Sequence, residues 1–269
     1  MVSASSLSKR MLRKTGLSRN RLAAGRLLAE RLALGAAGLP RRSVAKGGRI
    51  LCYHSIGQPE YGVNDVSPSR FRRQIDLALR LGFGFVPART IAEGKGGHHD
   101  LAITFDDATS SCIAAAAPIL SEYSIPWTLF VVAGWSDSAQ TGTTFMRWSD
   151  IGQLRDQNIA IGSHSVTHPD FSSLGDERIE EELTQSRQII HRRLGVLTDE
   201  FAIPFGQSRN WNAACQSAAL LAGYRHVYAQ SWHGRTAGTV PRSFVTRFDG
   251  DFIFKSLLHG AYDDWEEWY

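Results

Sequence analysis

The sequence predicts an α/β fold in which parallel strands are covered by helices. Short apolar runs alternate with longer segments whose apolar residues recur at helical spacing, over about 200 residues. Residues 50–269 contain no internal repeat and no low-complexity linker. Hydrophobic residues make up 43% and charged residues 21% of the chain, which excludes global disorder. Periodicity alone does not choose between an open doubly wound sheet and a closed or distorted β/α barrel. In both folds, chemistry belongs at the carboxyl ends of the strands.

The expected strands are short runs rich in apolar and β-branched residues. They lie at residues 49–53, 101–105, 127–132, 159–162, 201–203 and 226–229. The expected helices alternate with them, at residues 67–82, 110–123, 148–156, 176–194, 210–222 and 251–259. Pro68 suits the first turn of the first helix, and Gly82 suits its end. In the helix at 176–194 the acidic residues come first and Arg192 and Arg193 come last, as the helix dipole favours.

The net charge of +4 is unevenly divided along the chain. Residues 1–49 hold 12 Lys or Arg and one acid, Glu30, whereas residues 50–269 hold 18 basic and 25 acidic residues. The body is therefore acidic, which argues against a nucleic-acid groove in it. The three cysteines (Cys52, Cys112 and Cys215) are far apart, so neither a disulfide framework nor a cysteine zinc cluster is expected. No apolar run approaches the roughly 18 residues needed to span a bilayer.

Residues 1–48 are expected to form a basic N-terminal segment, partly helical or flexible, ahead of one domain at 49–269. Residues 22–39 can form a helix with Arg26 and Arg31 on its polar side. Three interpretations are open: a solvated tail, a basic amphipathic patch on an anionic membrane, and a transit peptide. A chain that starts near Lys46 is expected to fold. No cleavable signal peptide is evident, so we expect a cytoplasmic protein, with peripheral contact to the inner membrane as one option.

Two adjacent carboxylates, Asp106 and Asp107, close the apolar run at 101–105. Side chains alternate in direction along an extended chain, so one carboxylate can bind a metal while its neighbour acts as a base. An Asp-rich turn or a helix cap is the alternative without chemistry. His164 and His168 follow the run at 159–162, and histidines at i and i+4 share one face of a helical turn.

Asp107 and the two histidines together make a set of two imidazoles and one carboxylate. Three protein ligands with an open position for water are what a catalytic zinc or similar ion needs. The third segment, Pro204-Phe205-Gly206, ends another strand, and its turn could present a backbone N–H to an oxyanion. Scattered loop histidines and a simple strand-ending turn are the alternative interpretations.

The three segments together, TFDD, HSVTH and PFG, resemble the polysaccharide deacetylase family, also called carbohydrate esterase family 4 or the NodB-homology domain. The resemblance covers about residues 50–245, including ILCYH at 50–54 and PILSEYSIPWTLFVV at 118–132. It implies a distorted (β/α) barrel of about seven parallel strands at 49–269. The placement of a strand-ending His in ILCYH, ahead of TFDD, is similar to the permuted arrangement in the branch of the family that acts on poly-N-acetylglucosamine.

The resemblance also implies roles for individual residues. Asp106 is the implied general base, and Asp107, His164 and His168 are the implied metal ligands. Phe205 N–H is the implied oxyanion donor. His54 is the favoured general acid and His259 the alternative.

The sequence departs from the family pattern at two positions. Ala108 stands where Gly usually follows TFDD. Ala202 stands where the family often has the Arg that braces the base, and Arg242 is a candidate to replace it.

The implied function is metal-dependent hydrolysis of the N-acetyl group of an amino sugar or polysaccharide, in bacterial exopolysaccharide or surface glycan synthesis. The implied cofactor is a divalent metal, with zinc expected and cobalt, nickel or iron as alternatives. The expected partner is an acetylated amino-sugar substrate, and no nucleic acid is expected. An O-acetyl carbohydrate esterase and a non-catalytic glycan-binding relative remain as alternative functions.

Overall fold

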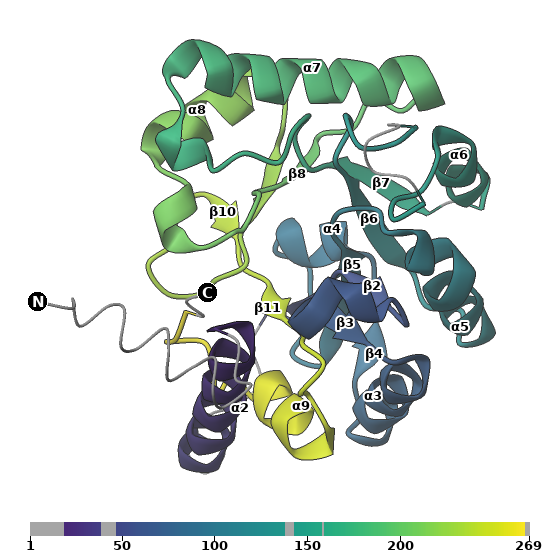
Figure 1. The fold of residues 1–269 in the computed structure, drawn as a ribbon, viewed down its shortest axis with the longest axis vertical. Coiled ribbons are helices and arrows are strands. Elements are labelled where there is room, and N and C mark those ends of the chain that lie inside the picture. Colours follow the sequence, from purple (N-terminus) through teal and green to yellow (C-terminus); the bar gives the residue numbers. More distant parts are fainter. Residues whose placement is uncertain (1–18, 39–46, 138–142, 158, 267–269) are drawn as a thin grey trace, which may run out of the picture.

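The structure is a computed structural model, which describes residues 19–38, 47–137, 143–157 and 159–266. Its centre is a curved, nine-stranded parallel sheet with the strand order β10-β9-β8-β7-β6-β5-β1-β11, in which β4 also pairs with β5 (Figure 1). The strands are β1 (Arg49–Tyr53), β4 (Gly84–Phe85), β5 (Asp100–Phe105), β6 (Trp127–Val131), β7 (Ala160–Ser163), β8 (Glu200–Ala202), β9 (His226–Tyr228), β10 (Thr239–Val240) and β11 (Ser243–Phe244). Two short strands, β2 (Ser55–Ile56) and β3 (Asp65–Val66), pair separately.

The sheet curls into a distorted and incomplete β/α barrel. Its edge strands β10 and β11 are joined by only two residues, Pro241 and Arg242, yet among the described strands they do not pair with each other. The barrel therefore stays open at this point, and Arg242 lies in the opening. All strand pairs of the large sheet are parallel, so their carboxyl ends meet at one edge.

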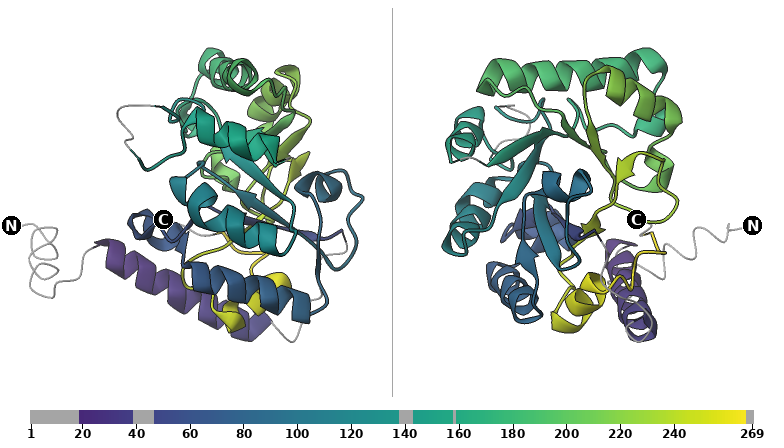
Figure 2. Two further views of the ribbon diagram at one scale, coloured as in Figure 1. Left: turned by 90° about the vertical axis from the view of Figure 1, so that its right-hand side faces the viewer. Right: turned by 180° about the vertical axis from the view of Figure 1, so that it is seen from behind.

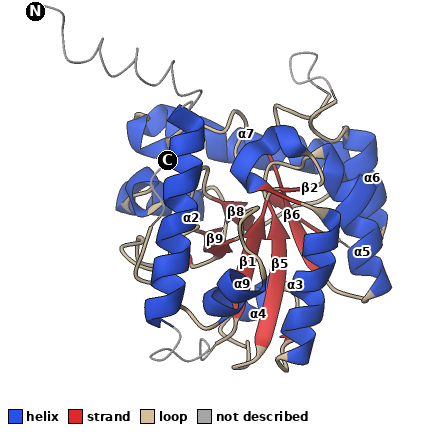
Figure 3. Cartoon of the chain, turned by 60° about the horizontal axis from the view of Figure 1, so that its bottom comes forward, coloured by secondary structure: helices blue, strands red, loops and turns tan. Residues whose placement is uncertain are grey.

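Helices pack around the outside of the sheet, as Figures 2 and 3 show. They are α2 (Arg19–Gly38), α3 (Pro68–Arg80), α4 (Ala88–Ala92), α5 (Ala117–Glu122), α6 (Trp148–Asp156), α7 (Asp176–Leu194), α8 (Ala213–Leu221) and α9 (Asp251–Leu258). Short turns of other helix types are η1 (Pro59–Asn64), η2 (Cys112–Ala116), η3 (Phe171–Ser173) and η4 (Ser208–Asn210).

Local sequence explains why α3 begins where it does. The hydroxyl of Ser67 accepts a hydrogen bond from Arg70 N, and Pro68 occupies the first turn. Phe71, Ile75 and other residues at helical spacing are buried against the sheet.

All six expected strands are present, and each strand end agrees with the expected one or differs from it by one residue. The sequence did not predict the two-residue strands, because so short a segment carries no period.

The helix α2 packs on the body of the molecule beside α9. Leu27 and Arg31 are buried, and Arg31 donates hydrogen bonds to Asp249 Oδ2 (3.0 Å) and Phe244 O (2.8 Å). The expectation that Arg31 lies on the polar side of the helix is therefore wrong, because its guanidinium pairs with the buried carboxylate of Asp249. In the described chain, no helix has both the length and the apolar character needed to cross a membrane.

Candidate active site

The residues singled out in the sequence meet at the carboxyl edge of the sheet. His54 follows β1, Asp106 and Asp107 follow β5, and His164 follows β7. Phe205 follows β8. Its side chain lines a cleft of about 310 Å³ together with His54, Asp107 and His168. His259 instead ends α9, where Arg49 at the start of β1 and His99 before β5 act electrostatically on it. The structure thus brings His54 to the cleft and leaves His259 at the opposite edge.

Asp107, His164 and His168 present ligand atoms to a common point. One atom from each lies within 4.8 Å of the others. Asp107 Oδ1 is 3.6 Å from His164 Nε2 and 3.7 Å from His168 Nε2. His164 Nδ1 lies 2.8 Å from Ala202 O, which fixes the proton on Nδ1 and leaves the Nε2 lone pair for a metal. The donor set is that of a catalytic zinc site.

The second observation that fits a cation is an unsatisfied buried oxygen. Asp107 Oδ1 is buried and accepts no hydrogen bond from any described residue, whereas Oδ2 accepts one from Tyr61 (3.0 Å). A buried carboxylate oxygen without a donor is costly unless a cation completes it. Burial raises the pKa of Asp107 to about 6, and burial lowers the pKa of His164 to about 3. At neutral pH both side chains are in the form that binds metal.

Asp106 is held by a buried arginine. Arg242 donates two hydrogen bonds, from Nη1 to Asp106 Oδ1 (2.6 Å) and from Nη2 to Oδ2 (2.8 Å). The Cys52 thiol lies 3.4 Å from Oδ2. Burial alone would raise the pKa of Asp106, but the adjacent Arg242 guanidinium, together with His164 and His54, outweighs burial and holds that pKa below its usual range. Arg242 therefore occupies the bracing position for which the sequence made it a candidate, in place of the missing arginine at Ala202.

His54 has the surroundings of a neutral, available base or acid. Its Nδ1 is buried and has no hydrogen-bond partner in the part of the chain that the structure describes, and its ring packs edge-on against Phe244 with 5.4 Å between the ring centroids. Burial lowers the pKa of His54, and the nearby carboxylates of Asp107 and Asp106 oppose that shift.

The loop that carries the two histidines is not a helical turn, so that expectation is wrong. The backbone leaves β7 in an irregular loop in which Ser165 (φ 70°) and His168 (φ 60°) are left-handed. Seven non-glycine residues of the described chain have positive φ, and five of them lie at this site: Asp107, Ala108, Ser165, His168 and Phe205. Such conformations cost about 1–3 kcal/mol each and persist only where the surroundings enforce them.

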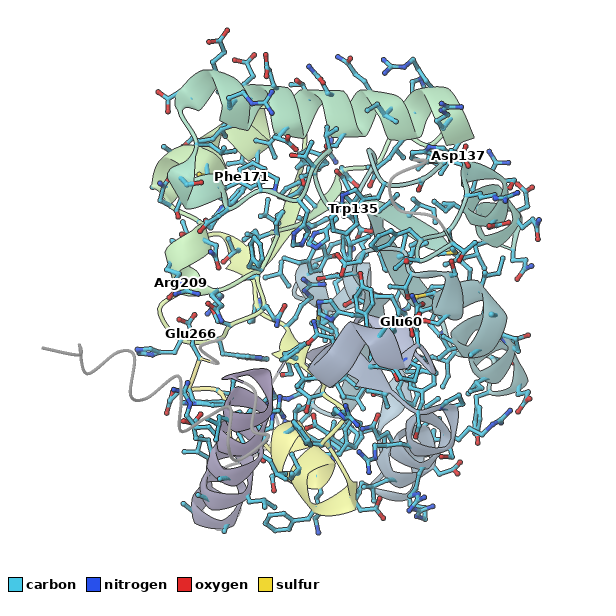
Figure 4. The ribbon with its side chains drawn as sticks, in the orientation of Figure 1. Glu60, Trp135, Asp137, Phe171, Arg209 and Glu266 are labelled. Carbon is cyan, nitrogen blue, oxygen red and sulfur yellow. The ribbon has the colours of Figure 1, made fainter. Side chains whose placement is uncertain are left out.

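Aromatic rings flank the site. Trp135, labelled in Figure 4, lies 5.3 Å from the ring of His168, and Phe205 lies 4.7 Å from it on the β8 side. The Phe205 side chain is 51% exposed. Gly206 (φ 67°) packs so closely on Gln230 that a Cβ there would be 2.5 Å from Gln230 Cβ. The sequence analysis missed Tyr61, which lies in η1, a turn without a motif.

Residues 93–227 match the sequence model of the polysaccharide deacetylase family. The chain belongs to this family. A chitooligosaccharide deacetylase from Rhizobium leguminosarum bv. trifolii is 24% identical over 137 residues, which is 51% of this chain and 59% of that protein. The chain thus spans less than two thirds of the length of this curated relative.

Two solved structures share the fold of this chain. The deacetylase PplD of Streptococcus pyogenes has a TM-score of 0.68 at 19% identity, covering 80% of this chain and 99% of that one. IcaB from Ammonifex degensii has a TM-score of 0.68 at 20% identity, covering 81% and 99%. At these identities the likeness concerns the fold, and it agrees with the distorted β/α barrel.

Proposed function

We propose that this protein is a metal-dependent hydrolase that removes the N-acetyl group from an N-acetylated amino sugar or polysaccharide. The observation that carries the proposal is the convergence of Asp107, His164 and His168 around an unsatisfied oxygen, with the Arg242-braced Asp106 alongside. The name of the rhizobial relative, a chitooligosaccharide deacetylase, supports this substrate class. A glycan-binding relative without catalysis would have no use for both a braced carboxylate and a metal set.

In the proposed reaction, water adds to the acetyl carbonyl carbon, the carbon–nitrogen bond breaks, and acetate and a free amine leave. A divalent ion held by Asp107, His164 and His168 supplies Lewis acidity when bound. Asp106 accepts the proton of the attacking water, since it stays ionised beside Arg242. Phe205 N–H donates to the developing oxyanion, and His54 donates a proton to the departing nitrogen.

Zinc is the proposed metal, because two imidazoles and one carboxylate with an open position form a common catalytic zinc set. Cobalt, nickel and iron suit the same ligands and remain alternatives in the proposal.

The test measures acetate release by the metal-loaded protein from N-acetylated chitooligosaccharides and from O-acetylated xylan. Release from the first and not the second is expected, and the reverse would favour an O-acetyl esterase. Asp107→Ala is expected to lose both metal and turnover. Asp106→Asn is the matched control, expected to keep the metal and lose turnover, because a base is not a ligand. An Asp107→Ala protein that retains one full equivalent of metal would contradict the ligand assignment.

We further propose that the enzyme works in the cytoplasm at the inner membrane, on a precursor of an exopolysaccharide or surface glycan. The support is the basic N-terminal segment, since cytoplasmic leaflets carry anionic lipids that attract Lys and Arg.

A further inference from the structure

The loop at 165–168 brings His168 to the metal set, but its own backbone does not favour the conformation that it adopts. Ser165 and His168 are both left-handed, within four residues. Inside the loop, His168 N donates to Ser165 Oγ (2.9 Å). One such bond leaves the two residues between them without support from the loop itself.

Part of the support comes from the segment after β6, where Ala133 N donates to Ser165 O and Gly134 N donates to Val166 O, both at 2.9 Å. The rest comes from Glu182, a residue of α7 for which the sequence analysis gave no role. Its Oε2 accepts hydrogen bonds from Val166 N (2.8 Å) and Thr167 N (3.0 Å), and its Oε1 accepts one from Thr167 Oγ1 (2.7 Å). Glu182 is only 2% exposed. Buried carboxylates are rare, and this one is balanced by three donors of one loop and by Arg178 at 3.4 Å.

A second contact from the same helix face steadies the strand that carries His164. Ser186 lies one turn after Glu182, and Ser163 Oγ donates to its hydroxyl at 2.9 Å. Figure 1 shows α7 lying over this part of the sheet. Helix α7 thus contacts the segment 163–168 immediately before His164 and between the two histidines.

We propose that Glu182 is a positioning residue that sets the metal affinity of the site by holding the loop at 166–167. The proposal rests on the proposed function, because it assumes that His168 is a ligand. Outer residues that orient metal ligands typically contribute about 10–100-fold in affinity. Glu182→Gln keeps one acceptor oxygen but replaces the other with an amide donor, which of these loop groups only Thr167 Oγ1 can accept. It also removes the charge that strengthens the three bonds, so the loop loses part of its support.

The test measures the Zn²⁺ dissociation constant of the metal-free protein by competition with a chromophoric chelator. Glu182→Gln and Glu182→Ala are expected to raise that constant by about 10–100-fold. Glu181→Gln is the matched control: it removes the neighbouring charge, which also pairs with Arg178, and among the described residues no hydrogen bond joins Glu181 to the loop at 165–168. This variant should bind zinc as the wild type does. The absorption bands of the Co²⁺-loaded protein are a second readout, because they follow ligand geometry.

Thr167→Val tests the same proposal if the Glu182 variants do not fold. It removes only the bond to Oε1, and a rise of several-fold in the dissociation constant is expected. Wild-type zinc affinity in the folded Glu182 variants, or in Thr167→Val if those fail, would overturn the proposal. His168→Ala separates the two proposals. If the His168→Ala protein keeps full zinc affinity, the proposed ligand set is wrong. If it loses zinc while Glu182→Gln keeps wild-type affinity, only the proposed role of Glu182 is wrong.

Discussion

Two adjacent carboxylates acquire opposite properties from their surroundings. Asp106 receives two hydrogen bonds from a buried guanidinium and stays ionised. Asp107 is buried with one oxygen unsatisfied, and burial raises its pKa to about 6. The first is thereby kept ionised, and the second keeps a buried oxygen that a cation can complete, although both belong to a single TFDD motif.

The raised pKa of Asp107 predicts how metal binding depends on pH. Above pH 6 the carboxylate is already ionised in the metal-free protein, so metal binds without displacing its proton. Below its folded pKa the metal must displace that proton, and apparent affinity should fall about tenfold per pH unit. The pKa of His164, about 3, keeps that ligand neutral at pH 5. Zinc dissociation constants measured by competition at pH 7 and pH 5 check this, and equal values would contradict it.

The general acid is tested by comparing His54 with His259. His54 lines the cleft, whereas His259 ends α9 at the opposite edge. His54→Ala is expected to retain metal and fold while kcat falls by about 10²–10⁴-fold, the usual contribution of a positioned acid. His259→Ala should change kcat little. Steady-state kinetics at matched metal content decide it, and an inactive His259→Ala beside an unaffected His54→Ala would refute the assignment.

At the scale of elements, α2 belongs to the packed structure. Besides the Arg31–Asp249 pair, Tyr262 donates to Arg31 O at 2.9 Å, and a Cβ at Gly38 would clash with Ala261. The prediction that a chain starting near Lys46 folds stays untested, but these contacts predict that such a chain is less stable. Such a chain would lack Arg31, so Asp249 would lose its cation, and the surface on which α2 packs would be exposed to water.

Arg31→Met is accordingly expected to lower the free energy of unfolding by about 3–5 kcal/mol, since removing one partner of a buried ion pair leaves the charge of the other uncompensated. Arg26→Met is the control on the same helix: its side chain is 59% exposed and pairs with Glu30 at 3.1 Å, so about 0.5 kcal/mol or less is expected. Urea unfolding monitored by circular dichroism measures both. Equal stability of the two variants would show that α2 contributes little to the fold.

The elements that the sequence predicted are those whose pattern is local. Apolar runs gave the six longer strands, and caps and helical spacing gave most helices. The segment His164–His168 was mispredicted as a helical turn, because the i, i+4 spacing of the two histidines also fits an irregular loop. Glu182 of α7 supports that loop and lies 16 and 15 residues after its two backbone donors, Val166 and Thr167. No local pattern encodes a support of that kind.

At the scale of the whole molecule, the motifs placed the site correctly at the carboxyl edge of the sheet, because parallel topology forces strand ends together. What the sequence left open were long-range pairings. Arg242 reaches Asp106 across 136 residues, and the sequence offered it only as a candidate. Tyr61 contacts Asp107 from η1, a turn that carries no chemical motif.

The charge distribution of the whole chain gives the last prediction. Residues 1–49 hold 12 basic residues and one acid, a net charge of +11, whereas residues 50–269 hold 18 basic and 25 acidic residues, a net charge of −7. Each Lys or Arg near an anionic bilayer contributes about 1 kcal/mol, and salt screens that attraction. The full chain should therefore bind phosphatidylglycerol vesicles at low salt and release them as salt rises.

Deleting α2 would confuse binding with folding, so the test uses charge substitutions. Replacing Lys9, Arg10, Arg13 and Lys14 by Gln is expected to weaken vesicle binding by about 10²–10³-fold. Replacing Arg73, Arg80, Arg192 and Arg193, which are exposed on the body, changes the net charge equally and should leave binding within about threefold. Cosedimentation at two salt concentrations measures both, and turnover of a small soluble substrate should be the same in each. Equal losses in the two variants, or no binding by the unmodified chain at low salt, would refute the membrane proposal.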